Sequence, residues 1–564
     1  MSSYNLLYEK WIPVVVGKGA ETKLVSIRDV FENASDYLAL ACDTKAQEFS
    51  VLRILLAINH TVFSRFDFEG EVYEYLQVDE NYVQLENAVE EEAYLYEDDL
   101  ENTWLDIWES KKFPQIIFDY LEKWEERFYL FDDKYPFMQV TEKDVRPDLL
   151  GNHNPTKISG KNINRLISES GNKISLFSPK NDFGSNKEIL KEDEIARWFL
   201  TFQGYSGLSD KRAYGTEKYK SSKGWLFDLG GIYLEGTNLF ETLMLNTVLY
   251  SEENYFLNIQ KPAWEYSSEE LLKKYLKKNN PLSIAELYTT WSRAIYISPN
   301  TNPDEPFSMY IVKLPDIDHG DKFLEPMTIW KLNKNGDYKD KITPKKHPAN
   351  QAMWRSFGLI TVEDHKAEAV RVPGVIAWYK KMSQLIDLPK IKINAISMKD
   401  DGNATSWVPV DEIYDYLFVD EVVIKDDEKE GWTPRVNATV EETKFAISVV
   451  YKKFLNDIRE IRNIESYGFS NRKIEELYYL VDQPFREWIS SIEKDDDKDL
   501  KILEWRKTLK KIIIREADRI VAEGTNRDFR GIEKNDKTMN IATAYSYFKH
   551  FLNKNLIVKE EYND

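Results

Sequence analysis

The chain opens with the stretch Asn5-Leu6-Leu7-Tyr8-Glu9-Lys10-Trp11-Ile12-Pro13-Val14. It holds two apolar-rich runs, which are typical of short β-strands. Proline has no backbone N–H to donate, so we expect Pro13 at the edge of a sheet or at the end of a strand. The stretch therefore predicts that the fold begins with β-structure.

Helical periodicity sets residues 433–564 apart from the rest of the chain. The segment Thr439-Val440-Glu441-Glu442 matches a capping box with Thr439 as N-cap. Apolar side chains then recur three and four residues apart in successive stripes, which run over Ile447–Ile461, Ile474–Trp488, Ile502–Ile520 and Ile541–Leu552. Pro484 is expected to kink the second stripe. The pattern predicts an all-α four-helix bundle over residues 433–564.

Residues 1–432 mix helical and strand-like patterns without regular alternation. Helical periodicity covers Ala46–Phe63, Phe113–Arg127 and Glu192–Phe202, and strand-like runs cover Gly231–Leu234, Ala294–Ile297, Ser308–Val312 and Val422–Ile424. Since these do not form repeated βαβ units, we expect the α+β class: a large irregular mixed N-terminal domain followed by the bundle. Stretches rich in Gly, Asn and Lys at residues 160–172, 179–187 and 206–224 are predicted to be long loops.

Composition limits the classes of protein that fit. No apolar run is long enough to span a membrane and no secretory signal is visible, so we expect a cytoplasmic protein without membrane contact. Cys42 is the only cysteine, which excludes an intrachain disulfide and a cysteine-based zinc cluster. The net charge of −20 argues against binding nucleic acid over the whole surface. Any DNA contact must therefore be local.

Motifs for catalysis are missing from the sequence. The six histidines show no zinc-protease or deaminase spacing, and no nucleotide-binding or nucleophile motif is present. Asp316, Asp318 and His319 could bind a metal, but a solvated loop explains them better. Catalytic groups can be assembled in space, so this does not prove inactivity. We nevertheless expect no enzyme, no cofactor and no metal.

Local binding signals are stronger. The cations Lys211, Arg212, Lys218, Lys220 and Lys223 crowd the segment 209–224, and such side chains can reach phosphates. A solvated surface loop is the alternative. Upstream, Gly204 and Gly207 would let the backbone approach a ligand closely. A second basic segment holds Lys331, Lys334, Lys339, Lys341, Lys345 and Lys346.

The segment Lys399–Trp407 contains Asp401-Gly402-Asn403, which is strong turn chemistry. The residues alone favour a plain hairpin between Ile391–Ile396 and Trp407–Val410. Asn403, Thr405 and Ser406 are compact donors and acceptors, so the tip of that hairpin could also probe a groove.

An ordered series of short motifs extends over essentially the whole chain. After the opening stretch come Phe128-Tyr129-Leu130-Phe131, Tyr135-Pro136-Phe137-Met138-Gln139, Gly171–Phe177, Gln203, Gly236-Thr237-Asn238-Leu239, Pro262-Ala263-Trp264-Glu265, Trp291 with Arg293, and Trp354-Arg355. In this order the series resembles the CasA-type large subunit of the type I-E CRISPR Cascade surveillance complex.

The resemblance implies a non-catalytic, DNA-binding subunit. It would read the protospacer-adjacent motif (PAM) of double-stranded target DNA through the minor groove. A hairpin tip would wedge the duplex open to start R-loop formation. The implied partners are the target DNA, the crRNA, the other Cascade subunits and the helicase–nuclease that the subunit helps to recruit.

The resemblance also assigns residues. The wedge would be Gly402, Asn403, Ala404, Thr405 and Ser406, with Asn403 one methylene shorter than the family's glutamine. Asn350-Gln351-Ala352 ranks second because it comes too early in the series. The PAM loop would be Gly204, Gly207, Ser209, Lys211 and Arg212, and the minor-groove or DNA-backbone contacts would be Lys313, Lys218 and Lys220. Contact with crRNA or neighbouring subunits would fall on Leu176, Phe177 and Ser178.

Two other readings remain open. In the first, the protein is a structural or assembly protein that docks partners through its helical bundle without reading DNA. In the second, it is an unrecognised hydrolase.

Overall fold

The computed structural model describes residues 4–17, 19, 21–169, 175–176, 185–208, 212–215, 218–361, 371–403, 405–534 and 537–557. Two compact units divide the chain. The first comprises residues 1–349, 364–379 and 393–416, and the second comprises residues 350–363, 380–392 and 417–564. The division into 1–432 and 433–564 stays a prediction from the sequence.

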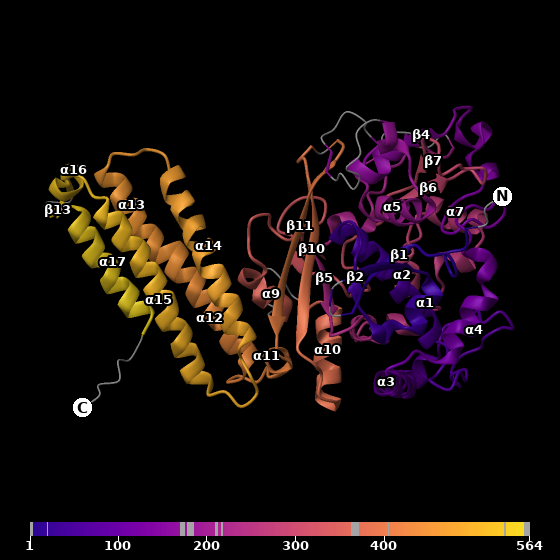
Figure 1. Ribbon diagram of the computed structural model, residues 1–564, viewed down its shortest axis with the longest axis horizontal. Coiled ribbons are helices and arrows are strands. Elements are labelled where there is room, and N and C mark those ends of the chain that lie inside the picture. The colour runs from indigo at the N-terminus through magenta and orange to yellow at the C-terminus, as the bar shows by residue number, and fades with distance from the viewer. Residues whose placement is uncertain are drawn as a thin grey trace. The chain divides into compact units, whose positions relative to one another are not determined.

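Helices and small sheets make up the described residues (Figure 1). The helices are α1 Ile27–Glu32, α2 Lys45–Phe63, α3 Ala93–Ser110, α4 Gln115–Lys123, α5 Glu192–Tyr205, α6 Leu239–Leu245, α7 Ser268–Leu276, α8 Ile284–Tyr288, α9 Phe357–Thr361, α10 Gly374–Leu385, α11 Glu421–Lys425, α12 Trp432–Phe445, α13 Lys452–Ile461, α14 Gly468–Ser490, α15 Lys498–Ala522, α16 Asn526–Arg530 and α17 Ile541–Asn555. None of these helices is both long and apolar enough to cross a membrane.

The strands are β1 Ile12–Val16, β2 Glu21–Val25, β3 Tyr37–Leu40, β4 Thr156–Ser159, β5 Gly231–Glu235, β6 Arg293–Tyr296, β7 Ser308–Lys313, β8 Trp330–Leu332, β9 Ile342–Pro344, β10 Ile391–Asp400, β11 Pro409–Val419, β12 Ile532–Lys534 and β13 Lys537–Met539. They form sheets of order β2-β1-β3, β4-β7-β6 and β11-β10-β5, and the pairs β8-β9 and β12-β13. The predicted α+β class is confirmed.

The opening stretch forms one strand rather than two. Its second apolar run becomes β1, whereas the first makes only an isolated bridge at Asn5 followed by a turn. The Trp11 indole is fully buried and donates to the carbonyl of Leu6 at 3.0 Å. β1 is the central strand of its sheet, so Pro13 is not on an edge strand. It is the second residue of β1, close to the strand end where its missing N–H is tolerated.

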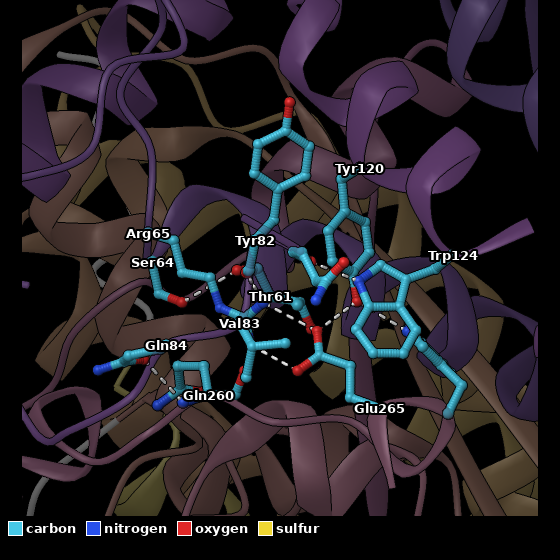
Figure 2. A network of polar contacts seen from close by, with 12 residues as sticks. Thr61, Ser64, Arg65, Tyr82, Val83, Gln84, Tyr120, Trp124, Gln260 and Glu265 are labelled. Atoms are coloured by element: carbon cyan, nitrogen blue, oxygen red, sulfur yellow. Dashed lines mark hydrogen bonds and ion pairs between the residues drawn. The ribbon is translucent and has the colours of Figure 1, made fainter. Parts of the chain in front are cut away.

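The core of the first unit is built around α2, in which every residue except Lys45 is buried. Charges in this core are paired because an unpaired buried charge is very costly. Figure 2 shows one such network: the Arg65 guanidinium faces the Glu265 carboxylate, at 2.8 Å, and the Tyr120 hydroxyl donates to the same carboxylate at 2.6 Å. Arg65 also donates to the carbonyls of Tyr82 and Gln260, each at 2.5 Å.

The second unit contains the helices of the predicted bundle. α12 continues through a π-helical segment, Ala446–Tyr451, into α13. α13 contacts α14 and α17, and α15 contacts α14 and α17. In Figure 1 these helices run alongside one another. Apolar stripes at helical spacing were therefore a sound guide to this part of the chain.

Three further local predictions were wrong. The stretch 160–172, expected to be a long loop, contains a π-helical turn at Asn162–Leu166. Val422–Ile424 is not a strand but part of helix α11, whose N-cap Asp420 accepts a hydrogen bond from the Val422 N–H at 3.2 Å. Thr439 is not an N-cap, because α12 already begins at Trp432. Its hydroxyl instead donates to the carbonyl of Arg435 at 2.8 Å, a bond that β-hydroxyl residues make inside helices.

Candidate nucleic-acid interface

The predicted hairpin exists, and its strands are longer than expected. β10 and β11 are neighbours in their sheet, and the N–H of Asp401 donates to the carbonyl of Val408 at 3.0 Å where they meet. Gly402 has a φ of +69°, a left-handed conformation that glycine adopts without strain. The Asp401 carboxylate accepts from the N–H groups of Asn403 and Val408, which fixes the turn.

Asn403 holds this turn together from within. Its Oδ1 accepts from the N–H and the hydroxyl of Thr405, at 3.1 and 2.8 Å. Its carbonyl accepts from the N–H groups of Ser406 and Trp407. Gly402, Asn403 and Thr405 are exposed and Ser406 is half-buried, whereas Ala404 lies outside the described residues. The carbonyl side of the Asn403 amide is thus committed to the turn, and Nδ2 has no recorded partner among the described residues.

Residues 206–208, called the glycine segment below, rest directly on this turn, although they lie about two hundred positions away in the sequence. The N–H of Leu208 donates to the carbonyl of Ser406 at 2.9 Å. A Cβ added at Gly207 would lie 2.3 Å from the carbonyl oxygen of Trp407. Two segments that the resemblance assigned separately to the DNA site are therefore in contact. Because Gly207 has no side chain, the backbone of the hairpin turn can pack against it.

The chain between Leu208 and Ser222 is called the basic loop below, and its described residues lie beside the end of β7. The N–H of Lys313 donates to the carbonyl of Arg212 at 2.9 Å, and the N–H of Asp316 donates to that of Lys220 at 2.9 Å. Tyr219 donates its hydroxyl hydrogen to the carbonyl of Lys313 at 2.6 Å. The backbones of Arg212, Lys220 and Lys313 thus come together; Ser209 and Lys211 lie outside the described residues, as do residues 216–217.

The cations of the basic loop differ in whether they pair with a described carboxylate. Lys220 pairs with Asp316 at 2.9 Å, and this hydrogen bond raises the pKa of Lys220. Arg212 and Lys218 are exposed and form no ion pair with any described residue. Lys313 is half-buried, with its ammonium 5.7 Å from the centre of the Tyr219 ring. Arg212 and Lys218 are therefore the charges best placed to meet phosphate.

Acidic side chains at the base of the hairpin are balanced by lysines. Lys346 pairs with Asp400 at 3.0 Å, and Lys223 pairs with Asp228 at 2.5 Å. Burial would raise the pKa of Asp228, but Lys223 and other nearby cations hold it below its usual value. These ion pairs limit the repulsion that the carboxylates would exert on a polyanion.

Other predicted positions lie elsewhere. Gly204 is in the last turn of α5, where an added Cβ would lie 2.8 Å from Leu226, so it serves packing. The N–H of Leu176 donates to the carbonyl of Arg165 at 2.8 Å, while Phe177 and Ser178 lie outside the described residues. Gln351 of the second-ranked motif belongs to the second unit.

The aspartates and the histidine of segment 316–319 have protein partners. Besides the Lys220–Asp316 pair, the His319 ring stacks on Trp225 with centroids 4.2 Å apart. The Asp318 carboxylate accepts from the N–H of Gly320. Within the described part of the chain, no group of three His, Cys, Asp or Glu side chains is arranged to hold a metal ion.

Sequence reasoning missed the contacts that organise this region. Trp407 supplies the carbonyl that Gly207 accommodates, and Arg293 donates to the carbonyl of Gly207 at 2.5 Å. Neither contact has a local signature, because the partners are far apart in sequence. The position of Arg293 beside Trp291 in the motif series was the one available signal.

Comparison with known proteins identifies the family to which the chain is similar. The model of a family described as CRISPR-associated protein Cse1 matches residues 5–515. The curated relative CRISPR-associated protein CasA/Cse1 of Thermus thermophilus is 27% identical over 269 residues, 47% of this chain. The match covers 42% of the relative, so the chain spans less than half the length of that curated protein.

Solved structures show the same fold. Cse1 of Thermobifida fusca matches with a TM-score of 0.75 at 21% identity, covering 99% of both chains. A chain from a CRISPR RNA-guided surveillance complex matches with a TM-score of 0.66 at 13% identity, covering 98% of this chain and 99% of that one. Because the family model covers most of the sequence, the chain belongs to the CRISPR-associated protein Cse1 family.

Proposed function

We propose that this chain is the non-catalytic large subunit of a type I-E CRISPR Cascade complex. It recognises the PAM of double-stranded DNA through the minor groove and wedges the duplex open with residues 401–406. It contacts crRNA and neighbouring subunits, and it helps to recruit the helicase–nuclease. The presence of a chain of similar fold in a CRISPR RNA-guided surveillance complex supports the assignment to such an assembly.

One observation carries the DNA-reading role: the exposed hairpin turn and the glycine segment are in contact. The Leu208–Ser406 hydrogen bond joins them. The loop that follows the glycine segment carries Arg212 and Lys218, which form no ion pair with a described residue. A narrow turn beside phosphate-binding cations suits the minor groove, where base edges distinguish mainly A·T from G·C. A protein that recognises DNA in this way can distinguish only a short sequence motif.

The energetics of the proposed wedge are reasonable. Unstacking a base step costs a few kcal/mol, which inserted side chains and phosphate contacts can offset. The net charge of −20 does not oppose this, because a local basic surface governs contact with a polyanion. Pairing with the guide RNA would supply the remaining sequence specificity.

A binding assay with the assembled complex tests the proposal. The complex with the chain should bind a PAM-bearing duplex, and the complex without it should bind only a target whose strands are already separated as a bubble. Replacing both Arg212 and Lys218 with glutamine should weaken duplex binding. Duplex binding that is unchanged by this double replacement would favour the alternative, in which the bundle docks partners and the chain reads no DNA.

A further inference from the structure

Arg293, the first residue of β6, is fully buried beneath the proposed DNA site. The three nitrogens of its guanidinium donate hydrogen bonds to four partners. Nη2 donates to the carbonyl of Gly207 at 2.5 Å, and Nη1 donates to the carbonyls of Ser222 and Ser292 at 2.5 and 2.8 Å. Nε donates to Glu169 at 2.7 Å. The rigid fork of an arginine suits this arrangement, and lysine cannot reproduce it.

Gly207 and Ser222 lie at the two ends of the basic loop. Arg293 therefore joins the ends of the segment that carries Arg212, Lys218 and Lys220. The N–H of Gly224 donates to the carbonyl of Ser206 at 2.9 Å and closes the same base. Fixing both ends of a loop reduces the conformations that its cations can sample.

The backbone around Arg293 is itself held in place. Gln203 accepts from the N–H groups of Ser292 and Arg293 at 2.9 and 3.0 Å, and it donates to the carbonyl of Arg293 at 2.8 Å. In the β6–β7 register Arg293 is the direct partner of Lys313. Arg293 is thus anchored by hydrogen bonds in its sheet, and from there its guanidinium can position the segment around Gly207.

We propose that Arg293 is a positioning residue. It fixes the position of the glycine segment and, through the Leu208–Ser406 hydrogen bond, the position of the hairpin turn. The inference rests on the proposed function and adds a buried determinant to it. Since Arg293 is 0% exposed, it acts on DNA only through the segments that it holds.

Buried arginines can also serve stability alone, and the chain offers a matched control. Arg65 is fully buried as well, and it too binds one glutamate and backbone carbonyls, those of Tyr82 and Gln260 (Figure 2). It holds no part of the glycine segment or the hairpin. A purely structural role would make Arg293→Lys and Arg65→Lys behave alike.

The experiment compares these two variants in the assembled complex. Thermal unfolding reports stability, and binding is measured on a PAM-bearing duplex, on a duplex with altered recognition letters and on a bubble target. For Arg293→Lys we expect about tenfold weaker binding to the PAM-bearing duplex, with bubble binding unchanged, because charge-assisted hydrogen bonds to the loop are lost. Arg65→Lys should lower the unfolding temperature without changing the duplex-to-bubble ratio. Equal ratios in both variants would overturn the inference.

Glu169→Gln provides a second variant should Arg293→Lys fail to fold. It preserves shape but removes the charge that orients Nε, so we expect a smaller fall in the same ratio, of roughly threefold. A wild-type ratio in Glu169→Gln would then count against Arg293. If the wild-type complex binds the PAM-bearing duplex and the altered duplex equally well, the proposed function itself is contradicted. That result can be told apart from a failure of the Arg293 inference.

Discussion

Gly207 lies against the hairpin turn so closely that a single added carbon would collide with it. A Cβ there would come within 2.3 Å of the Trp407 carbonyl oxygen and 2.7 Å of the Ser406 carbonyl oxygen. Both contacts are with backbone, which cannot rotate away as a side chain can. The turn must therefore shift if residue 207 gains a side chain.

Gly207→Ala is expected to destabilise the chain by about 1–3 kcal/mol, the usual cost of overpacking. It should also weaken binding to the PAM-bearing duplex, because the turn is displaced. Thermal unfolding and a DNA-binding assay measure the two effects.

Gly468→Ala is the control, since Gly468 is exposed and is the first residue of α14. It should leave DNA binding unchanged. Full duplex affinity in Gly207→Ala would show that the glycine segment and the turn are not coupled.

At the residue scale, the DNA-contacting roles that the sequence suggested stay predictions, and the structure adds protein contacts that the sequence did not predict. The sequence singled out Gly207, but as a place for close approach of DNA, whereas its nearest neighbour is Trp407. It singled out Asn403 as a probe, whereas the Asn403 Oδ1 caps its own turn. Residue type and spacing reveal chemistry, but only the fold decides which partner that chemistry meets.

The basic arm, the β8–β9 hairpin with the turn that joins its strands, carries the second cluster of lysines that the sequence singled out. Lys341, the residue directly before β9, lies 4.0 Å from Asp318, close in sequence to the Asp316 that pairs with Lys220. Lys334 and Lys339 are exposed and form no ion pair with a described residue. If the proposed DNA site extends along Asp316–Asp318, Lys334 and Lys339 are the cations of the basic arm that would add phosphate contacts.

Replacing Lys334 and Lys339 with glutamine should weaken duplex binding without regard to sequence. The slope of log K against log salt should become shallower by about 0.9 for each lysine that touches a phosphate. Discrimination between matched and altered recognition letters should stay the same.

Binding titrations at several salt concentrations measure the slope. The control replaces Lys507 and Lys511, exposed lysines of α15 in the second unit, with glutamine. An unchanged slope in the arm variant, or an equal change in the control, would remove the basic arm from the interface.

At the element scale, periodicity was reliable where an element buries one face. The helices of the bundle and α2 lie where the apolar spacing predicts them. Short apolar runs were not reliable: Val422–Ile424 has strand-like composition, yet the Asp420 cap starts a helix there. In the same way, Thr439 and Glu442 match a capping box inside a continuous helix. Short signals are ambiguous because tertiary packing decides between them.

The whole molecule carries buried histidines that make its stability depend on pH. Burial lowers the pKa of His60 to about 3 and that of His347 to about 4. In the unfolded chain such groups bind a proton below about pH 6.5. Between pH 6.5 and 4 the unfolded state therefore binds more protons, so stability falls as the pH falls.

His347→Gln should reduce this dependence. Between pH 7.5 and 5 the wild-type chain should lose about 2 kcal/mol more than the variant, from 1.4 kcal/mol per pH unit below the unfolded pKa. Urea unfolding at both pH values measures the difference. The exposed His153→Gln serves as control. Parallel pH dependence in wild type and His347→Gln would show that His347 does not titrate as described.

At the scale of the whole molecule, the sequence predicted the class and the helical bundle, and the ordered motifs led to the family. It did not predict the contacts that join Gly207, Leu208 and Ser222 to Arg293 and Ser406. The strands and loops that bring them together pair over long distances in sequence. Such pairings leave no local pattern.

The central claim is that the turn at residues 401–406 separates the strands of the target next to its recognition letters. The most direct measurement places a fluorescent base analogue, whose emission rises on unstacking, beside the PAM. It compares the wild-type complex with one in which residues 401–406 are replaced by a two-residue Asn-Gly turn. The account predicts a rise in emission with the wild type and none with the trimmed turn, while both bind bubble DNA equally well. An equal rise with both complexes would contradict it.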